Sequence, residues 1–205
     1  MRIAITPRFF ENKVDRLLGI ERKYYSFFEK YGHNLHLIPF TGISVGEYFD
    51  DLNPDLIVFA GGYRLYSNEI KNFETKVLKE SLKRKLPILG ICCGMWTINY
   101  YFKGTLKFNE SHQAFDGVKI DIKKMLHKVK ATDFIEKGLY TVNTFHSKVI
   151  DVLGEGLKCF LMAEDNTIEG FYDSDKRIIG IQFHMENKGV SNNLTKQLMK
   201  KIEKL

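Results

Sequence analysis

Short apolar runs alternate with amphipathic segments in the first half of the chain, and this pattern predicts strands separated by helices. The expected strands are Arg2–Thr6, Asn34–Pro39, Asp55–Ala60 and Leu86–Ile91. The expected helices are Arg22–Tyr31 and Asn68–Lys85. Strands joined through helices form right-handed crossovers, so this half predicts an α/β fold with a mostly parallel central sheet.

The second half changes to shorter apolar runs, which predict a smaller antiparallel β portion. The strands expected there are Val118–Ile122, Phe145–Val152, Lys158–Ala163, Thr167–Tyr172 and Arg177–Phe183. Asp165-Asn166 supplies a tight hairpin turn. A helix over Gly189–Leu205, with Leu194, Leu198 and Ile202 on one face, is expected to close the chain. No linker or internal repeat divides it, so residues 1–205 are expected to form a single domain.

The composition favours a soluble globular protein, with 44% hydrophobic and 27% charged residues among 205. No apolar run approaches the roughly 18 residues of a membrane span, and the N-terminus lacks a signal-peptide core. Three cysteines make no disulfide framework, which favours the reducing cytoplasm. A net charge of +6 hints at anionic ligands, but without a basic tract it does not predict binding to a nucleic acid polymer.

The stretch LPILGICCGMWTINY, residues 86–100, predicts a buried strand that breaks sharply into a helix. Cys92 lies at the break with Gly90 and Gly94 on either side, the small residues that a crowded nucleophile elbow requires. The dipole and free N–H groups of a helix N-terminus stabilise a thiolate placed there. We therefore take Cys92 as the candidate nucleophile, although a buried cysteine is commonly inert core. Cys93 is expected to offer its backbone N–H to an oxyanion hole.

Two other stretches could complete such a site. His184 follows an apolar strand, and Glu186, two residues on, can curl back to orient the imidazole. A cysteine and a histidine with an orienting acid form the usual arrangement for acyl transfer through a thioester. Gly61 and Gly62 also follow a buried strand, where backbone N–H groups can approach a ligand. Each of these two stretches is weak support when taken alone.

In their order, these motifs resemble those of the class I glutamine amidotransferases. The similar stretches are a buried strand ending in Gly-Gly, LPILGICCG, KGTL at 103–106, VNTFHS at 142–147, AEDNTIE at 163–169 and IIGIQFHME. The chain looks most like the stand-alone γ-glutamyl hydrolases of that family, such as γ-glutamyl-γ-aminobutyrate hydrolase. The resemblance implies a flavodoxin-like three-layer sandwich and a catalytic triad of Cys92, His184 and Glu186.

The resemblance also implies a substrate pocket. Ser147 is expected to hold the α-amino-acid end of a glutamyl group, with Phe145 and His146 lining the same pocket. Trp96 stands where the family usually has Gln, and Arg64 where Asp is common after the Gly-Gly pair. Both are expected near the pocket, so both departures leave the identity of the substrate open.

These roles imply hydrolysis of the C–N bond of a small γ-glutamyl compound. Cys92 would attack the γ-carbonyl, and the N–H groups of Cys93 and of Gly61 or Gly62 would hold the oxyanion. His184 would protonate the leaving nitrogen and then activate the water that releases glutamate. No metal and no cofactor are expected. Histidines that show no ligand spacing, and are expected to be surface or structural, are His33, His36, His112 and His127.

The leaving group remains open at this point. Arg64 and the aromatic Trp96 would suit a phosphate and a ring, as in the γ-glutamyl-CDP-amidate hydrolases of the family, which act in capsule phosphoramidate synthesis. One alternative is a glutaminase subunit that supplies ammonia to a separate synthetase. Another is a catalytically silent binding protein on the same scaffold. A homo-oligomer is compatible with all three.

Overall fold

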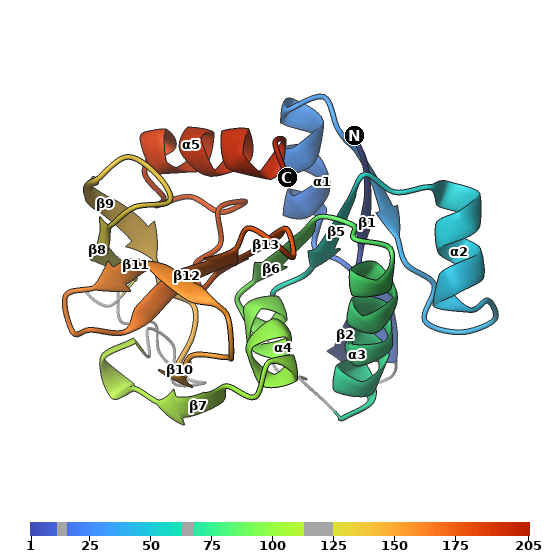
Figure 1. Ribbon diagram of the computed structural model, residues 1–205, viewed down its shortest axis with the longest axis horizontal. Helices are drawn as coiled ribbons and strands as arrows, with labels where there is room; N and C mark the ends of the chain where they lie inside the picture. The colour runs from blue at the N-terminus through green and yellow to red at the C-terminus, as the bar shows by residue number, and fades with distance from the viewer. Residues whose placement is uncertain (12–15, 63–67, 113–124) are drawn as a thin grey trace.

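The computed structural model describes residues 1–11, 16–62, 68–112 and 125–205 (Figure 1). Its helices are α1 (Arg22–Lys30), α2 (Val45–Leu52), α3 (Asn68–Lys83), α4 (Cys93–Tyr101), the short 3-10 helix η1 (Glu110–His112) and α5 (Asn192–Ile202). Its strands are β1 (Arg2–Ile5), β2 (Arg8–Glu11), β3 (Arg16–Gly19), β4 (Asn34–Leu37), β5 (Leu56–Phe59), β6 (Ile88–Ile91), β7 (Thr105–Phe108), β8 (Leu126–Ala131), β9 (Gly138–Asn143), β10 (Lys148–Val152), β11 (Lys158–Ala163), β12 (Ile168–Asp173) and β13 (Ile178–Ile181). The predicted strand Val118–Ile122 and the predicted pocket residue Arg64 lie outside the described residues.

The main sheet has two parts that differ in strand direction. Strands β4, β1, β5, β6 and β13 lie side by side in that order and all pair in parallel. Counted along the chain, this is the 2-1-3-4-5 order of flavodoxin-like folds, so the predicted α/β fold class is confirmed. The sheet continues through β12, β11, β8 and β9, each antiparallel to its neighbour, while β10 bridges β12 and β7.

Helices cover both faces of the parallel part. Successive side chains of a strand point to opposite faces, and β1 shows the result: Ile3 and Ile5 join one core cluster, and Ala4 joins the other. The first cluster contains residues of α1 and α5, and the second contains residues of α2, α3 and α4. Figure 1 shows α1 and α5 on one side of the sheet and α3 and α4 on the other. The arrangement is a three-layer sandwich.

The strands of the parallel part lie within two residues of their predicted positions, whereas some other elements differ from prediction. The predicted strand from Phe145 begins only at Lys148, because residues 144–147 form a loop between β9 and β10. Helix α2 was not predicted, although it carries a capping box: Ser44 Oγ accepts from Glu47 N–H, and the Glu47 carboxylate accepts from Ser44 N–H. Within the described residues, no helix is long and apolar enough to cross a membrane.

Candidate active site

The predicted elbow forms at the end of β6. Cys92 has φ 49° and ψ −110°, a backbone conformation that side-chain-bearing residues rarely adopt and that functional sites often hold under strain. Its own N–H donates to Ile181 of β13, and α4 begins at the next residue. A methyl group on Gly90 would lie 2.6 Å from Ile98 Cδ1, and one on Gly94 would overlap the backbone of Phe59. Both flanking glycines are therefore required by close packing, as the sequence predicted.

His184 and Glu186 form a buried pair just beyond β13. The Glu186 Oε1 atom lies 2.6 Å from Nδ1 of His184, which leaves the imidazole Nε2 for other partners. Asn143 at the end of β9 fixes the backbone of His184 through two hydrogen bonds, accepting from its N–H and donating to its carbonyl. Burial alone would raise the pKa of Glu186, but the charge and hydrogen bond of His184 lower it overall. The carboxylate is thus anionic and holds the imidazole in one orientation.

Gly61 brings the two halves of the site together. A methyl group on Gly61 would lie 3.1 Å from Cys92 Cβ and 2.5 Å from His184 Cε1. The thiol side chain and the imidazole therefore flank the same glycine at the carboxyl ends of adjacent strands. Carboxyl ends of parallel strands are where ligands bind in open α/β sheets.

The backbone N–H groups predicted for an oxyanion hole differ in their partners. The Gly61 N–H donates to the hydroxyl of Tyr24, a buried residue of α1, at 2.8 Å. The Gly62 N–H makes no hydrogen bond with another described residue, and the Gly62 carbonyl accepts from the thiol of Cys93. Of the two glycines, Gly62 is therefore the one whose N–H has no partner within the described part of the chain. An oxyanion role for Gly62 and Cys93 stays a prediction.

A buried ion pair packs against the Gly61-Gly62 segment. Arg8 is the first residue of β2 and pairs with Glu74 of α3 at 2.8 Å, with both side chains at most 6% exposed. The Arg8 guanidinium also donates to the carbonyl of Ala60, and its side chain contacts the position that a Gly62 methyl group would occupy. Thr6 donates to the same carboxylate. This network joins the ends of β1 and β5 to α3 beside Gly61 and Gly62. It was not predicted from the sequence.

The adjacent thiols of Cys92 and Cys93 shift each other's pKa in opposite directions. Interaction with the thiol of Cys92 lowers the pKa of Cys93 to about 7 against the effect of burial, and the nearby Arg8 charge adds to this lowering. Interaction with Cys93, together with burial, raises the pKa of Cys92. Two thiols that share a proton carry their first negative charge jointly. Deprotonation of the pair is therefore expected to begin near neutral pH, close to His184.

We expect this charge to appear in the pH dependence of thiol alkylation. Iodoacetamide reacts with thiolates, so the alkylation rate of the native pair should rise with pH through a midpoint near 7, below the 8.5 of an ordinary cysteine. Burial raises the pKa of Cys159, which serves as an internal comparison and should react only at higher pH. Tandem mass spectrometry of the labelled peptides measures each site. A midpoint at 8.5 or above for the pair would contradict the shared thiolate.

Two predicted pocket residues have clear positions. The Phe145 ring lies edge-on to the imidazole of His184, with 5.9 Å between ring centroids. Trp96 is 7% exposed, and its indole N–H donates to Gln182 of the loop after β13 at 2.8 Å. The Trp96 N–H is thus engaged within the protein, while the Phe145 ring borders the candidate catalytic histidine.

The other two predicted pocket residues belong to the same loop between β9 and β10. Ser147 is half-buried, and its carbonyl accepts from the N–H of Asn109. His146 is buried and points toward Glu169 of β12, with Nε2 3.7 Å from Oε1. A role for these residues in substrate binding stays a prediction.

Sequence reasoning missed several residues that shape this region. Two of them, Asn143 and Glu169, could have been found because they lie within the quoted VNTFHS and AEDNTIE motifs. Nothing local pointed to Tyr24 or to the pairing of Arg8 with Glu74. His112 and His127 were expected to be surface or structural, and the structure places both beside Glu169.

Comparison with known proteins identifies the family. The model of the glutamine amidotransferase class-I family matches residues 14–200. The chain belongs to the class I glutamine amidotransferases. Among curated relatives, the γ-glutamyl-CDP-amidate hydrolase of Campylobacter jejuni is 33% identical over 145 residues, covering 67% of this chain and 65% of that protein. The glutamine-hydrolysing GMP synthase of Dictyostelium discoideum is 28% identical over 138 residues, covering 64% of this chain but 18% of the relative.

Solved structures agree on the fold. A protein of Thermoplasma acidophilum, provisionally described as one component of a GMP synthase, superposes with a TM-score of 0.74 at 18% identity. The match covers 100% of this chain and 92% of that one. Together with the family match, this confirms the predicted class I amidotransferase type of the α/β fold.

Proposed function

We propose that the chain hydrolyses γ-glutamyl amides by covalent catalysis through Cys92. The observation that carries the proposal is the meeting at Gly61 of a strained-elbow thiol and an imidazole already bonded to a carboxylate. Such a set of nucleophile, base and orienting acid is recognised by geometry and roles. Members of the family act on glutamine-type amides, which supports hydrolase activity.

The proposed reaction has two halves. The sulfur of Cys92 attacks the γ-carbonyl carbon, and the carbonyl electrons move onto oxygen, where the N–H groups of Cys93 and Gly62 stabilise the charge. Protonated His184 gives its proton to the leaving nitrogen as the C–N bond breaks, which leaves a γ-glutamyl thioester. Neutral His184 then takes a proton from water, the water oxygen attacks the thioester, and the C–S bond breaks to release glutamate. Glu186 holds the imidazole throughout.

We further propose a nucleotide-linked leaving group of the CDP-amidate type. The 33% identity to a γ-glutamyl-CDP-amidate hydrolase supports this choice over other γ-glutamyl amides. The matched region spans 65% of that relative, so its activity is carried over here as a proposal only. The part expected of Arg64, a contact to phosphate, rests on the sequence.

A second candidate function is a glutaminase subunit that delivers ammonia to a synthetase. The similarity to a glutamine-hydrolysing GMP synthase favours it, because the matched region is a small part of a larger protein. In this case the same residues would carry out the same chemistry on glutamine, and a partner would consume the ammonia.

Glutamate release from a substrate panel separates the two functions. The panel holds glutamine, γ-glutamyl amines, γ-glutamyl peptides and a γ-glutamyl phosphoramidate nucleotide. We expect kcat/KM for the phosphoramidate nucleotide to exceed that for glutamine by at least about 100-fold, since a site built for polar groups of its substrate rejects compounds that lack them. Turnover of glutamine alone, or only after a synthetase is added, would instead support the ammonia-donor function.

A further inference from the structure

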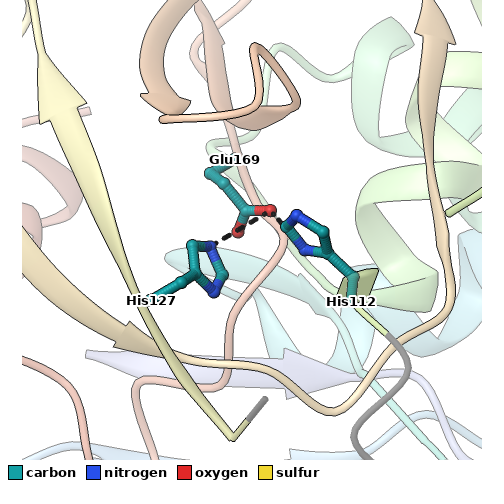
Figure 2. A group of neighbouring side chains, drawn as sticks. All are labelled: His112, His127 and Glu169. Carbon is teal, nitrogen blue, oxygen red and sulfur yellow. Dashed lines mark ion pairs between the residues drawn. The ribbon is translucent and has the colours of Figure 1, made fainter. Parts of the chain in front are cut away.

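Four side chains from separate elements converge on one point in the antiparallel part of the sheet. They are His112 of η1, His127 of β8, His146 of the β9–β10 loop and Glu169 of β12. Figure 2 shows His112 and His127 pointing at the carboxylate of Glu169 from opposite sides. His112 Nδ1 lies 3.6 Å from Glu169 Oε1, His127 Nε2 3.6 Å and His146 Nε2 3.7 Å. All three imidazoles thus face the same oxygen.

These atoms are buried but have no hydrogen-bond partner among the described residues. The set includes His112 Nδ1, His127 Nε2, both ring nitrogens of His146 and both oxygens of Glu169. The distances to Oε1 exceed the 2.7–3.2 Å of an N–H···O bond, so the histidines do not simply share protons with the carboxylate. The side chains of His146 and Glu169 are 0% exposed. Leaving a buried carboxylate and several imidazole nitrogens unpartnered is costly, and one cation among them would satisfy most of them.

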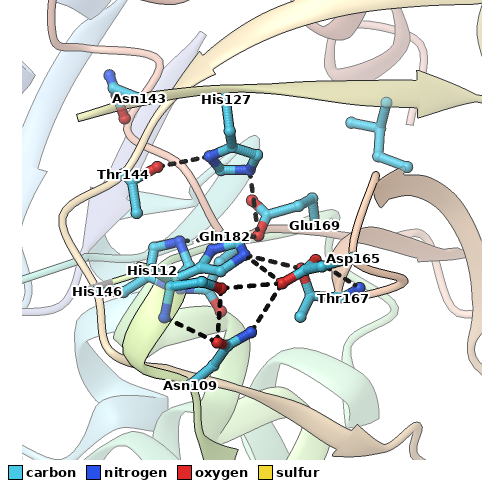
Figure 3. A network of polar contacts seen from close by, with 12 residues as sticks. Asn109, His112, His127, Asn143, Thr144, His146, Asp165, Thr167, Glu169 and Gln182 are labelled. Carbon is cyan, nitrogen blue, oxygen red and sulfur yellow. Dashed lines mark hydrogen bonds and ion pairs between the residues drawn. The ribbon is translucent and has the colours of Figure 1, made fainter. Parts of the chain in front are cut away.

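Outer contacts turn two of the imidazoles toward this point (Figure 3). His112 Nε2 lies 3.0 Å from the carboxylate of Asp165, so it carries the proton and leaves the Nδ1 lone pair facing Glu169. His127 Nδ1 lies 2.5 Å from the hydroxyl of Thr144, which leaves its Nε2 facing the same way. A carboxylate or hydroxyl behind a histidine is the usual second partner of a metal-binding imidazole.

We propose that His112, His127, His146 and Glu169 bind one divalent first-row transition metal ion, of which Zn²⁺ fits best. Imidazole suits such ions, and a tetrahedral site with bonds of 2.0–2.1 Å places its ligand atoms about 3.4 Å apart. Each of the three histidine nitrogens lies 3.6–3.7 Å from Glu169 Oε1, close to that value, and the ligand atoms of His112, His127 and Glu169 all lie within 4.8 Å of one another. Four protein ligands close the coordination sphere, which is typical of a structural site.

The position of the site indicates what the ion would hold together. A surface pocket of about 220 Å³, lined in part by His112, His127 and Asp165, gives access to the cluster. His146 follows Phe145, whose ring packs against the candidate catalytic His184. An ion there would tie the β9–β10 loop to β12 and so fix one wall beside His184. This role for the ion does not depend on the proposed reaction.

Cobalt binding tests the proposal without any use of activity. The full chain, freed of metal by dialysis against a chelator, is titrated with Co²⁺ and then competed with Zn²⁺. We expect one Co²⁺ per chain with the intense visible absorption of tetrahedral Co²⁺, displacement by Zn²⁺, and a rise in melting temperature on Zn²⁺ addition. His127→Gln and Glu169→Gln should each weaken binding by more than about 100-fold, and Asp165→Asn by about 10- to 100-fold.

His33→Gln is the matched control, because His33 also lies beside a carboxylate, that of Glu203, but away from the cluster. It should bind Co²⁺ like the unaltered chain, and melting curves of the metal-free variants check that each one folds. Absence of Co²⁺ and Zn²⁺ binding by the folded chain would overturn the proposal. Binding that is kept in both His127→Gln and Glu169→Gln but lost in Cys92→Ala would also overturn it, since the ion would then occupy the thiol site.

Discussion

Replacing Cys92 with alanine should lower kcat/KM for γ-glutamyl amide hydrolysis by at least about 10⁴-fold, whereas Cys93→Ala should retain most of the activity. The loss corresponds to about 5 kcal/mol of transition-state stabilisation, as expected when a covalent nucleophile is removed. Cys92 alone occupies the strained elbow position against Gly61, while the thiol of Cys93 points back to the carbonyl of Gly62. Glutamate release measured side by side for the two variants decides between the thiols.

The pair of variants is well matched, because both cysteines are buried and adjacent in the sequence. Each variant removes one thiol from the same local environment, so a general effect of cavity formation should appear in both. Cys93→Ala should change the pH dependence of alkylation, since the proton-sharing partner is gone. Loss of activity in Cys93→Ala with retention in Cys92→Ala would reverse the assignment of the nucleophile.

The parallel core of the fold could be predicted because its strands are buried on both faces and read as short apolar runs. Leu56–Phe59 and Ile88–Ile91 are entirely buried, and both match predicted strands within two residues. The antiparallel part was harder. Strands such as β7, whose TLKF sequence is mostly exposed, carry too few buried apolar residues to be distinguished from loops.

In the candidate site too, features set by neighbouring residues could be predicted, whereas features set by residues far apart in the sequence could not. The elbow was predictable because one crowded turn dictates the residues on both sides of Cys92 within five positions. The His112, His127, His146 and Glu169 cluster was not predictable, because each side chain comes from a different element and the spacings follow no metal-binding motif. Only the folded chain, through β8, β12, η1 and the β9–β10 loop, brings these side chains together.

Replacing Glu186 with glutamine should lower kcat for γ-glutamyl amide hydrolysis by about 10³- to 10⁴-fold while changing KM little. The Glu186 carboxylate can only accept a hydrogen bond, so at 2.6 Å it holds the proton of His184 on Nδ1 and keeps Nε2 for the reaction. A glutamine amide can donate to Nδ1 and so stabilise the opposite tautomer. In that tautomer Nε2 carries the proton and cannot act as the general base. It also removes the negative charge that stabilises the imidazolium. Together these effects amount to about 4–5 kcal/mol.

Glu203→Gln provides the control for this substitution, because Glu203 also lies beside a histidine, with Oε1 3.1 Å from Nε2 of His33. That pair is away from the thiols, so its loss should leave kcat unchanged and affect only stability. The melting temperature of Glu186→Gln must be measured as well, because replacing a buried carboxylate that pairs with His184 can also lower the stability of the fold. A folded Glu186→Gln protein with kcat within about tenfold of the unaltered chain would show that the carboxylate does not orient the base. The catalytic arrangement would then be a Cys92–His184 dyad, in which the side chain of Asn143 fixes the backbone of His184.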